Sequence, residues 1–261
     1  MVDIVIPVYK ETPDEEDIIS LRQLFNTLGG KYPVSFIYPK TMNIEHYKSF
    51  GKSDFIDFDD YFFKGIQGYN QLMLNLKFYK TFCRKYLLIY QTDALVFSDE
   101  LSYWCTKNYD YIGAPWLRSR ENIPLIKKIF DKAVYFIKKT VNYRNNGKWQ
   151  KDKSLLYNNV GNGGFSLRKR EKFIEVLERL DKVVKIYSEP INQSEFYAED
   201  VFFSVEPERN GIPFSKPDFK EACAFSIENK PEKAMEYNRG KLPFGCHRWN
   251  KENKTFWKKY L

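Results

Sequence analysis

The side chains best suited to chemistry lie in five short patches. These are residues 91–93 (Gln-Thr-Asp), 113–116 (Gly-Ala-Pro-Trp), 161–166 (Gly-Asn-Gly-Gly-Phe-Ser), 199–201 (Glu-Asp-Val) and 243–247 (Pro-Phe-Gly-Cys-His). They supply carboxylates that could hold a hard divalent cation, glycines that let backbone approach a ligand, an acidic pair that could accept a proton, and a late histidine. Each patch is a weak signal alone, so its meaning depends on the fold that brings the patches together.

Asp93 and His247 are the candidate metal ligands. Asp93 follows an apolar run, where it either caps a neighbouring backbone N–H or holds Mg²⁺ or Mn²⁺ against phosphate oxygens. His247 is one of two histidines in the chain. It is either a packed structural residue or a neutral imidazole that coordinates Mn²⁺ or hydrogen bonds to a phosphate. The adjacent Cys246 would suit zinc, but no further ligands at zinc spacing accompany it.

The glycine patch and the acidic pair have competing interpretations. Gly163 and Gly164 precede an ordered, strand-like segment, so they form either a flexible loop or a place where backbone approaches a ligand closely. No Gly-Lys-Ser/Thr follows at the required spacing, so the patch is not a P-loop. Glu199 and Asp200 open an expected helix, where acids either favour the helix dipole or provide a general base for an attacking hydroxyl.

Alternating strands and helices must position these residues. Apolar patterning predicts strands at 2–9, 34–38, 55–58 and 86–90, and helices at 14–28, 66–82, 124–141 and 169–184. This order predicts an α/β fold whose mostly parallel sheet is flanked by helices. Ligands bind beyond the carboxyl ends of such strands, so segments 7–9 and 91–93 could face one cleft. We find no repeat or flexible linker and expect one compact domain over residues 1–261.

The positive charge is concentrated in one insertion. The net charge is +8, and residues 117–157 contain 11 basic and 3 acidic residues, which is also a net +8. The rest of the chain therefore sums to about zero, which disfavours a general polyanion binder or a nucleic-acid partner. Within the insertion, 124–141 reads as an amphipathic basic helix. It is either a solvated helix packed on the domain or a contact to anionic lipid or an anionic acceptor carrier.

Cysteine usage and hydropathy indicate the compartment. The four cysteines form no Cys-x-x-Cys pair, and no signal peptide precedes the first strand, so we expect a cytoplasmic protein. No apolar stretch approaches the roughly 20 residues needed to span a bilayer. We therefore expect any membrane contact to be peripheral, on the inner face of the cytoplasmic membrane and through residues 117–157.

The order of the patches resembles GT-A-fold glycosyltransferases. It is most similar to a bacterial family long described as a domain of unknown function with a proposed glycosyltransferase role. The resembling parts are residues 86–97, 109–116, 161–168, 199–204 and 243–249. The resemblance implies a GT-A-type, Rossmann-like sheet with a basic helical insertion. It also implies a nucleotide-binding half over residues 1–98 and an acceptor half over 99–261.

The resemblance further implies roles for individual residues. Asp93 matches the last Asp of an Asp-x-Asp motif and would bind metal together with His247, while Asp200 matches the catalytic base, with Glu199 beside it. The residues that would bind the nucleotide sugar are Pro7, Val8, Tyr9, Tyr69, Asn70, Gln91, Thr92, Asp93, Gly163 and Gly164. One departure is that Gln91 replaces the first Asp of the motif, which weakens the expected coordination of Mn²⁺ or Mg²⁺.

The implied activity is transfer of a sugar from a nucleotide-diphosphate donor, with UDP-sugars favoured, to an acceptor hydroxyl. We expect inversion at the sugar, with Asp200 as general base and a glycan or lipid-linked acceptor of bacterial surface polysaccharide or glycoconjugate synthesis. Two alternatives stay open. One is a retaining GT-A transferase, and the other is a non-catalytic binder of carbohydrate or nucleic acid.

Overall fold

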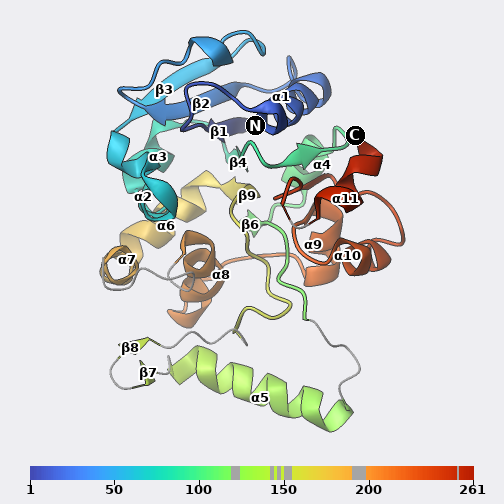
Figure 1. Cartoon of the computed structure of the whole chain (residues 1–261). Coiled ribbons are helices and arrows are strands. Elements are labelled where there is room, and N and C mark those ends of the chain that lie inside the picture. Colours follow the sequence, from blue (N-terminus) through green and yellow to red (C-terminus); the bar gives the residue numbers. More distant parts are fainter. Residues whose placement is uncertain (119–123, 142–143, 146–147, 150–154, 190–197, 252) are drawn as a thin grey trace.

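A six-stranded sheet lies at the centre of the molecule, in the order β3-β2-β1-β4-β9-β6 (Figure 1). The computed structural model describes residues 1–118, 124–141, 144–145, 148–149, 155–189, 198–251 and 253–261. The strands of the sheet are β1 (Val2–Pro7), β2 (Val34–Pro39), β3 (Asp54–Phe58), β4 (Tyr86–Tyr90), β6 (Tyr111–Ile112) and β9 (Phe165–Lys169). β1 to β4 run parallel, whereas β9 pairs antiparallel with both β4 and β6.

Alternating side chains of β4 enter two different apolar cores. Leu87 and Ile89 face a cluster that includes residues of α2 (Gly65–Met73), α3 (Leu76–Thr81), α6 (Arg170–Arg179), α7 (Asp181–Ser188) and α8 (Glu199–Arg209). Leu88 and Tyr90 face the opposite cluster, which includes α1 (Glu15–Thr27) and α4 (Leu101–Thr106). Because both faces of the strand are covered, it reads as a continuous apolar run, as is typical of parallel sheets.

A second, small sheet has the order β10-β11-β5, with β10 at Ser226–Ile227, β11 at Gly245–Cys246 and β5 at Leu95–Val96. The remaining helices are α5 (Leu125–Val141), α9 (Phe219–Phe225), α10 (Pro231–Tyr237) and α11 (Lys254–Trp257). A two-stranded pair joins β7 (Arg144–Asn145) to β8 (Lys148–Trp149). Short 3₁₀ helices occupy Glu45–Tyr47, Asp60–Phe63 and Lys258–Tyr260.

The predicted α/β class with a mostly parallel sheet is confirmed, but two predicted helices are wrong in their extent. The helix expected at 66–82 is divided into α2 and α3, because the Asn75 side chain accepts the backbone N–H of Lys77 and begins a new helix. The helix expected at 169–184 likewise ends at Arg179, and Asp181 begins α7. Apolar periodicity continued across both junctions, so it did not mark them.

Strands from both predicted halves share the central sheet, since β6 and β9 come from residues 99–261. The basic helix predicted at 124–141 is present as α5, which lies at the opposite end of the molecule from β1, β2 and β3 (Figure 1). Among the described helices, none combines the length and apolarity that crossing a bilayer requires.

Candidate functional site

The candidate site lies at the carboxyl ends of β1 and β4. Strand order reverses between these neighbours, since β2 and β3 extend from one side of β1 and β4 lies on the other. Crevices at such reversals are where α/β sheets bind ligands. The patch at 91–93 follows β4 directly, and the Gln91 N–H donates to Gly164 O at 2.8 Å. The first and third sequence patches therefore meet at this edge of the sheet.

A tight turn holds Asp93 at the end of β4. The Ala94 N–H donates to Gln91 O at 2.9 Å, which places Thr92 and Asp93 at the two central positions of the turn. The chain then enters β5, so the turn is anchored by a strand on each side. Asp and Asn favour such positions, and here the result is a carboxylate held on rigid elements.

Pairing of β5 with β11 brings the distant His247 to this turn. The register places Cys246 opposite Leu95, and the Trp249 N–H donates to Asp93 O at 3.1 Å. As a result, His247 Nε2 lies 3.0 Å from Asp93 Oδ1 and 3.0 Å from Gln91 Oε1. Three potential ligand atoms, two oxygens and one nitrogen, thus converge, although His247 follows Asp93 by 154 positions in the chain.

Glu228 lies against the other edge of the His247 ring, and the sequence did not indicate it. β10 pairs with β11 and the His247 N–H donates to Ile227 O at 3.0 Å, so Glu228 Oε1 lies 3.6 Å from His247 Nδ1. The Asn162 side chain donates to the same carboxylate. Burial alone would lower the pKa of His247, but the Asp93 and Glu228 carboxylates outweigh it and raise that pKa to about 10. The free protein therefore holds an imidazolium at neutral pH.

Two glycines leave the space that these side chains occupy. A Cβ on Gly164 would lie 2.1 Å from His247 Nε2, and a Cβ on Gly163 would lie 1.8 Å from Glu199 Oε1. Real Cβ contacts are never that short, so neither position accepts a side chain unless its neighbour moves. The glycine patch is therefore an ordered close approach of backbone to two polar side chains, with β9 beginning directly after it.

Arg168 and Glu199 form a buried ion pair beneath the glycine patch. Arg168 Nη2 lies 3.0 Å from Glu199 Oε1, and the two side chains are 0% and 3% exposed. Arg168 also donates to the Ser166 hydroxyl at 3.0 Å and the Gly163 carbonyl at 3.3 Å. The sequence analysis missed Arg168. A signal existed, because Arg168 stands two residues after Ser166 and alternation places both on one face of β9.

Asp200 differs from its neighbour in environment. It is half-buried in the first turn of α8, and its Oδ1 accepts the Val201 N–H at 2.7 Å. Burial, followed by the nearby Glu199 and Glu228 carboxylates, raises the pKa of Asp200 to about 7. A carboxyl with such a pKa can gain and lose a proton near neutrality, which suits general acid–base work.

The residues predicted to bind the nucleotide base occupy diverse positions. Pro7 and Val8 are buried, and the Val8 side chain packs in the core beneath the sheet edge. Tyr9 is exposed at the end of β1. On α2, Asn70 is buried and accepts the Glu199 N–H at 3.2 Å, so it anchors the start of α8. Tyr69 places a buried hydroxyl that has no hydrogen-bond partner in the described part of the chain.

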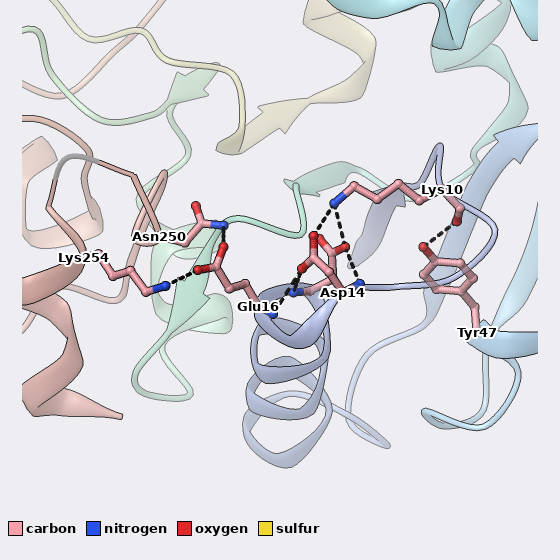
Figure 2. Close-up of polar contacts among 7 residues, drawn as sticks. Lys10, Asp14, Glu16, Tyr47, Asn250 and Lys254 are labelled. Carbon is pink, nitrogen blue, oxygen red and sulfur yellow. Dashed lines mark hydrogen bonds and ion pairs between the residues drawn. The ribbon is translucent and has the colours of Figure 1, made fainter.

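Polar contacts join the loop after β1 to the start of α1, and α1 to the C-terminal segment (Figure 2). Lys10 Nζ bonds to Asp14 at 2.5 Å and to Asp17 at 3.0 Å, and the Tyr47 hydroxyl donates to Lys10 O at 2.8 Å. Glu16 accepts from the Asn250 amide at 2.6 Å and pairs with Lys254. The segment that carries His247 is thereby attached to the first helix.

The side chains around Asp93 offer only a few ligand atoms for a hard divalent cation. Asp93 Oδ1 is buried and lies 3.0 Å from His247 Nε2. Burial would raise the pKa of Asp93, but His247 holds it below its usual value, so the oxygen is ionised. In the described part of the chain, no group of three or more His, Cys, Asp or Glu side chains could enclose a metal. The amide oxygen of Gln91 would complete a set of one carboxylate, one imidazole and one amide.

The fold is similar to that of solved sugar transferases. The galactosyltransferase LgtC, solved with donor and acceptor sugar analogues, matches with a TM-score of 0.56 at 11% identity, over 99% of this chain and 94% of that one. GlyE, a glycosyltransferase of Streptococcus pneumoniae, matches with a TM-score of 0.50 at 10% identity, over 99% of this chain and 59% of that one. Core-mannan synthase A of Aspergillus fumigatus, in its Mn/GDP form, matches with a TM-score of 0.49 at 13% identity, over 79% and 69%.

The match to LgtC confirms the expected GT-A-like fold. No curated protein matches the sequence. One family model, described as a protein of unknown function (DUF5672), matches residues 52–247 and so includes the turn at 91–93, the glycine patch, the acidic pair and His247. The match spans most of the chain, and the protein therefore belongs to the DUF5672 family.

Proposed function

We propose that this protein is a glycosyltransferase that moves a sugar from a nucleotide-diphosphate donor to an acceptor hydroxyl. The observation that carries the proposal is the concentration of unsatisfied polar atoms at one edge of the sheet. Buried side-chain atoms without hydrogen-bond partners in the described part of the chain include Tyr69 Oη, Asn162 Oδ1 and Glu199 Oε2, which accompany the buried pair of Asp93 and His247. Native proteins leave few such atoms, and a polar ligand that meets several of them accounts for their presence together.

The donor diphosphate would lie at the end of β4. His247 carries a positive charge in the free protein, which favours a phosphate oxygen beside it. A Mn²⁺ or Mg²⁺ ion held by Asp93, His247 and the Gln91 amide would neutralise charge on the leaving diphosphate. His247 would then have to release its proton, since only the neutral imidazole coordinates a metal.

Asp200 would act as the general base. The acceptor oxygen attacks the anomeric carbon as its proton passes to the Asp200 carboxylate, while the bond to the diphosphate breaks. The pKa of about 7 gives this carboxylate more basic strength than an ordinary Asp while leaving much of it ionised at neutral pH. Glu199 would position rather than react, because its Oε1 is committed to Arg168. Alignment of donor and acceptor over Gly163 and Gly164 would supply further rate.

A thermal-shift screen against UDP, GDP, CDP and dTDP, each with Mn²⁺ and with EDTA, tests the donor site. A ligand that binds only the folded state raises the melting temperature. We expect one nucleotide to stabilise the protein, with a smaller effect in EDTA and in an Asp93→Ala variant. Exposed Glu178 on α6 provides a matched control, and Glu178→Gln should respond like the native chain. The absence of a shift with every nucleotide would contradict the proposal.

Product analysis tests the base. Once the donor is identified, the Asp200→Asn variant should fold normally but transfer sugar several orders of magnitude more slowly. The product formed by the native chain should have inverted configuration at the anomeric carbon. A product with retained configuration would agree with a glycosyltransferase but would exclude Asp200 as the general base, because a retaining reaction does not deprotonate the acceptor in this way.

A further inference from the structure

Helix α5 exposes an apolar stripe to solvent. Ile126, Ile129, Phe130 and Ile137 are 58 to 82% exposed, and Ala133 is exposed between them. At 100° per residue these five positions fall within an arc about 100° wide. Phe136, on the same helix, is also 68% exposed, whereas the other large apolar side chains that are exposed in the described part of the chain are scattered over separate elements. The apolar side of this amphipathic helix is therefore not packed on the domain.

Basic residues border the stripe. Lys127 and Lys132 are exposed and lie about 60° beyond its two edges, where long side chains can extend their ammonium groups past an apolar surface. The whole insertion, 117–157, carries a net +8 from 11 basic and 3 acidic residues. An apolar stripe between lysines is complementary to a surface that offers acyl chains below and negative headgroups above.

The position of α5 relates this stripe to the candidate site. α5 contacts α8, whose first turn carries Asp200. In Figure 1 α5 forms one end of the molecule, with α8 between it and the central sheet. A surface that bound the exposed side of α5 would therefore lie beyond α8, at the end of the molecule opposite β1, β2 and β3.

We propose that α5 docks the protein on an anionic lipid bilayer, with its apolar stripe in the headgroup region and its lysines on the acidic headgroups. A second copy of this chain is a poorer occupant, because pairing two such stripes would bring their flanking lysines together. A polyanion without an apolar part would leave the stripe in water. The inference does not depend on the transferase proposal, since it concerns where the protein binds and not what it catalyses.

Vesicle flotation of the full chain tests the docking. We expect binding to vesicles of phosphatidylcholine with 30% phosphatidylglycerol in about 0.1 M salt, and much weaker binding to pure phosphatidylcholine. Ile126→Ser/Phe130→Ser should lower the partition coefficient at least about tenfold, because two large apolar side chains leave the interface. Lys127→Gln/Lys132→Gln should lower it about fivefold per lysine and weaken its dependence on salt.

Matched controls come from elsewhere on the surface. Ile66 is also strongly exposed and Lys80 forms an exposed ion pair, so Ile66→Ser and Lys80→Gln should bind vesicles like the native chain. All variants should keep their melting temperature and any nucleotide-induced shift, which separates this test from that of the donor site.

Three outcomes would overturn the proposal: no binding to anionic vesicles, equal binding to neutral and anionic vesicles, or equal loss in the control variants. Sedimentation velocity tests the remaining alternative, in which a second copy of this chain covers the stripe. A dimer that Ile126→Ser/Phe130→Ser dissociates would assign the stripe to self-association instead.

Discussion

The buried ion pair between Arg168 and Glu199 allows a quantitative test of how the glycine patch is held. Glu199→Gln keeps the shape of the side chain and removes its charge, so Arg168 stays buried without its ionic partner. Removing one member of a buried pair costs about 3–5 kcal/mol, because the desolvated charge left behind is uncompensated.

The contacts that Arg168 keeps in Glu199→Gln determine how large the destabilisation is. Its guanidinium still donates to the Tyr79 hydroxyl at 2.9 Å and to the Gly163 carbonyl, and it lies 5.7 Å from the Tyr111 ring and 5.5 Å from the Phe173 ring. Ring faces stabilise a desolvated cation. We therefore expect the lower end of the range, about 3 kcal/mol. For a chain of this size that corresponds to a melting temperature roughly 10 °C lower.

Urea denaturation of paired variants provides the assay. Lys80 and Glu178 form an ion pair at 2.8 Å, but both side chains are half exposed, at 52% and 50%. Glu178→Gln should therefore change the free energy of unfolding by less than about 1 kcal/mol. Arg168→Met/Glu199→Gln, in which neither charge is present, should recover part of the loss seen in Glu199→Gln. Equal midpoints for Glu199→Gln and Glu178→Gln would refute the reasoning.

Three further predictions concern the reacting groups. Asp200 is influenced by the Glu199 and Glu228 carboxylates and by the Arg168 guanidinium. Its raised pKa predicts that kcat/KM for transfer increases as pH rises through about 7. A value of kcat/KM that is independent of pH from 5 to 9 would contradict this. The folded-state pKa lies above the ordinary value of an Asp carboxyl, so the stability that the neutral carboxyl contributes is present below about pH 4 and lost as pH rises through about 7. Asp200→Asn should accordingly raise the melting temperature more at pH 8 than at pH 4, and an equal change at both would count against the buried carboxyl. Gly164→Ala would set a Cβ 2.1 Å from His247 Nε2 and should weaken metal-dependent nucleotide binding severalfold in calorimetry; unchanged affinity would show that the His247 ring position is unimportant.

The sheet was predictable because its signals are local. Strands β1, β2 and β4 are apolar runs of five or six residues, and the alternation with helices selects a parallel arrangement. The division of 66–82 was not predicted, because a single capping side chain, Asn75, outweighs the apolar periodicity that continues past it. Amphipathicity likewise predicted α5 but not the side that faces water, because that depends on how the helix lies against α8.

The site was less predictable because its assembly depends on very short pairings. His247 reaches Asp93 through β5 and β11, each of two residues, and no periodicity can be read from a two-residue strand. The resemblance to GT-A transferases suggested that these residues meet, whereas their spacing alone did not. Glu228 follows β10, another two-residue strand, and nothing in its local sequence distinguishes it from a solvated surface acid. Residues that act through such pairings are found only once the tertiary structure is known.

Glu199 and Asp200 show how one helix turn can give adjacent carboxylates different tasks. Successive side chains on a helix diverge by about 100°, so only one of the two can reach Arg168 on β9. Glu199 takes that partner and is held in the ion pair beneath Gly163. Asp200 is left with a backbone N–H, and burial, followed by the field of the Glu199 carboxylate, raises its pKa toward neutrality. The ion pair therefore does more than stabilise the glycine patch. Its Glu199 member supplies part of the negative potential that keeps the Asp200 carboxyl able to exchange a proton at physiological pH, whereas Arg168 opposes it, and Glu199→Gln should therefore shift the pH profile of transfer to lower pH.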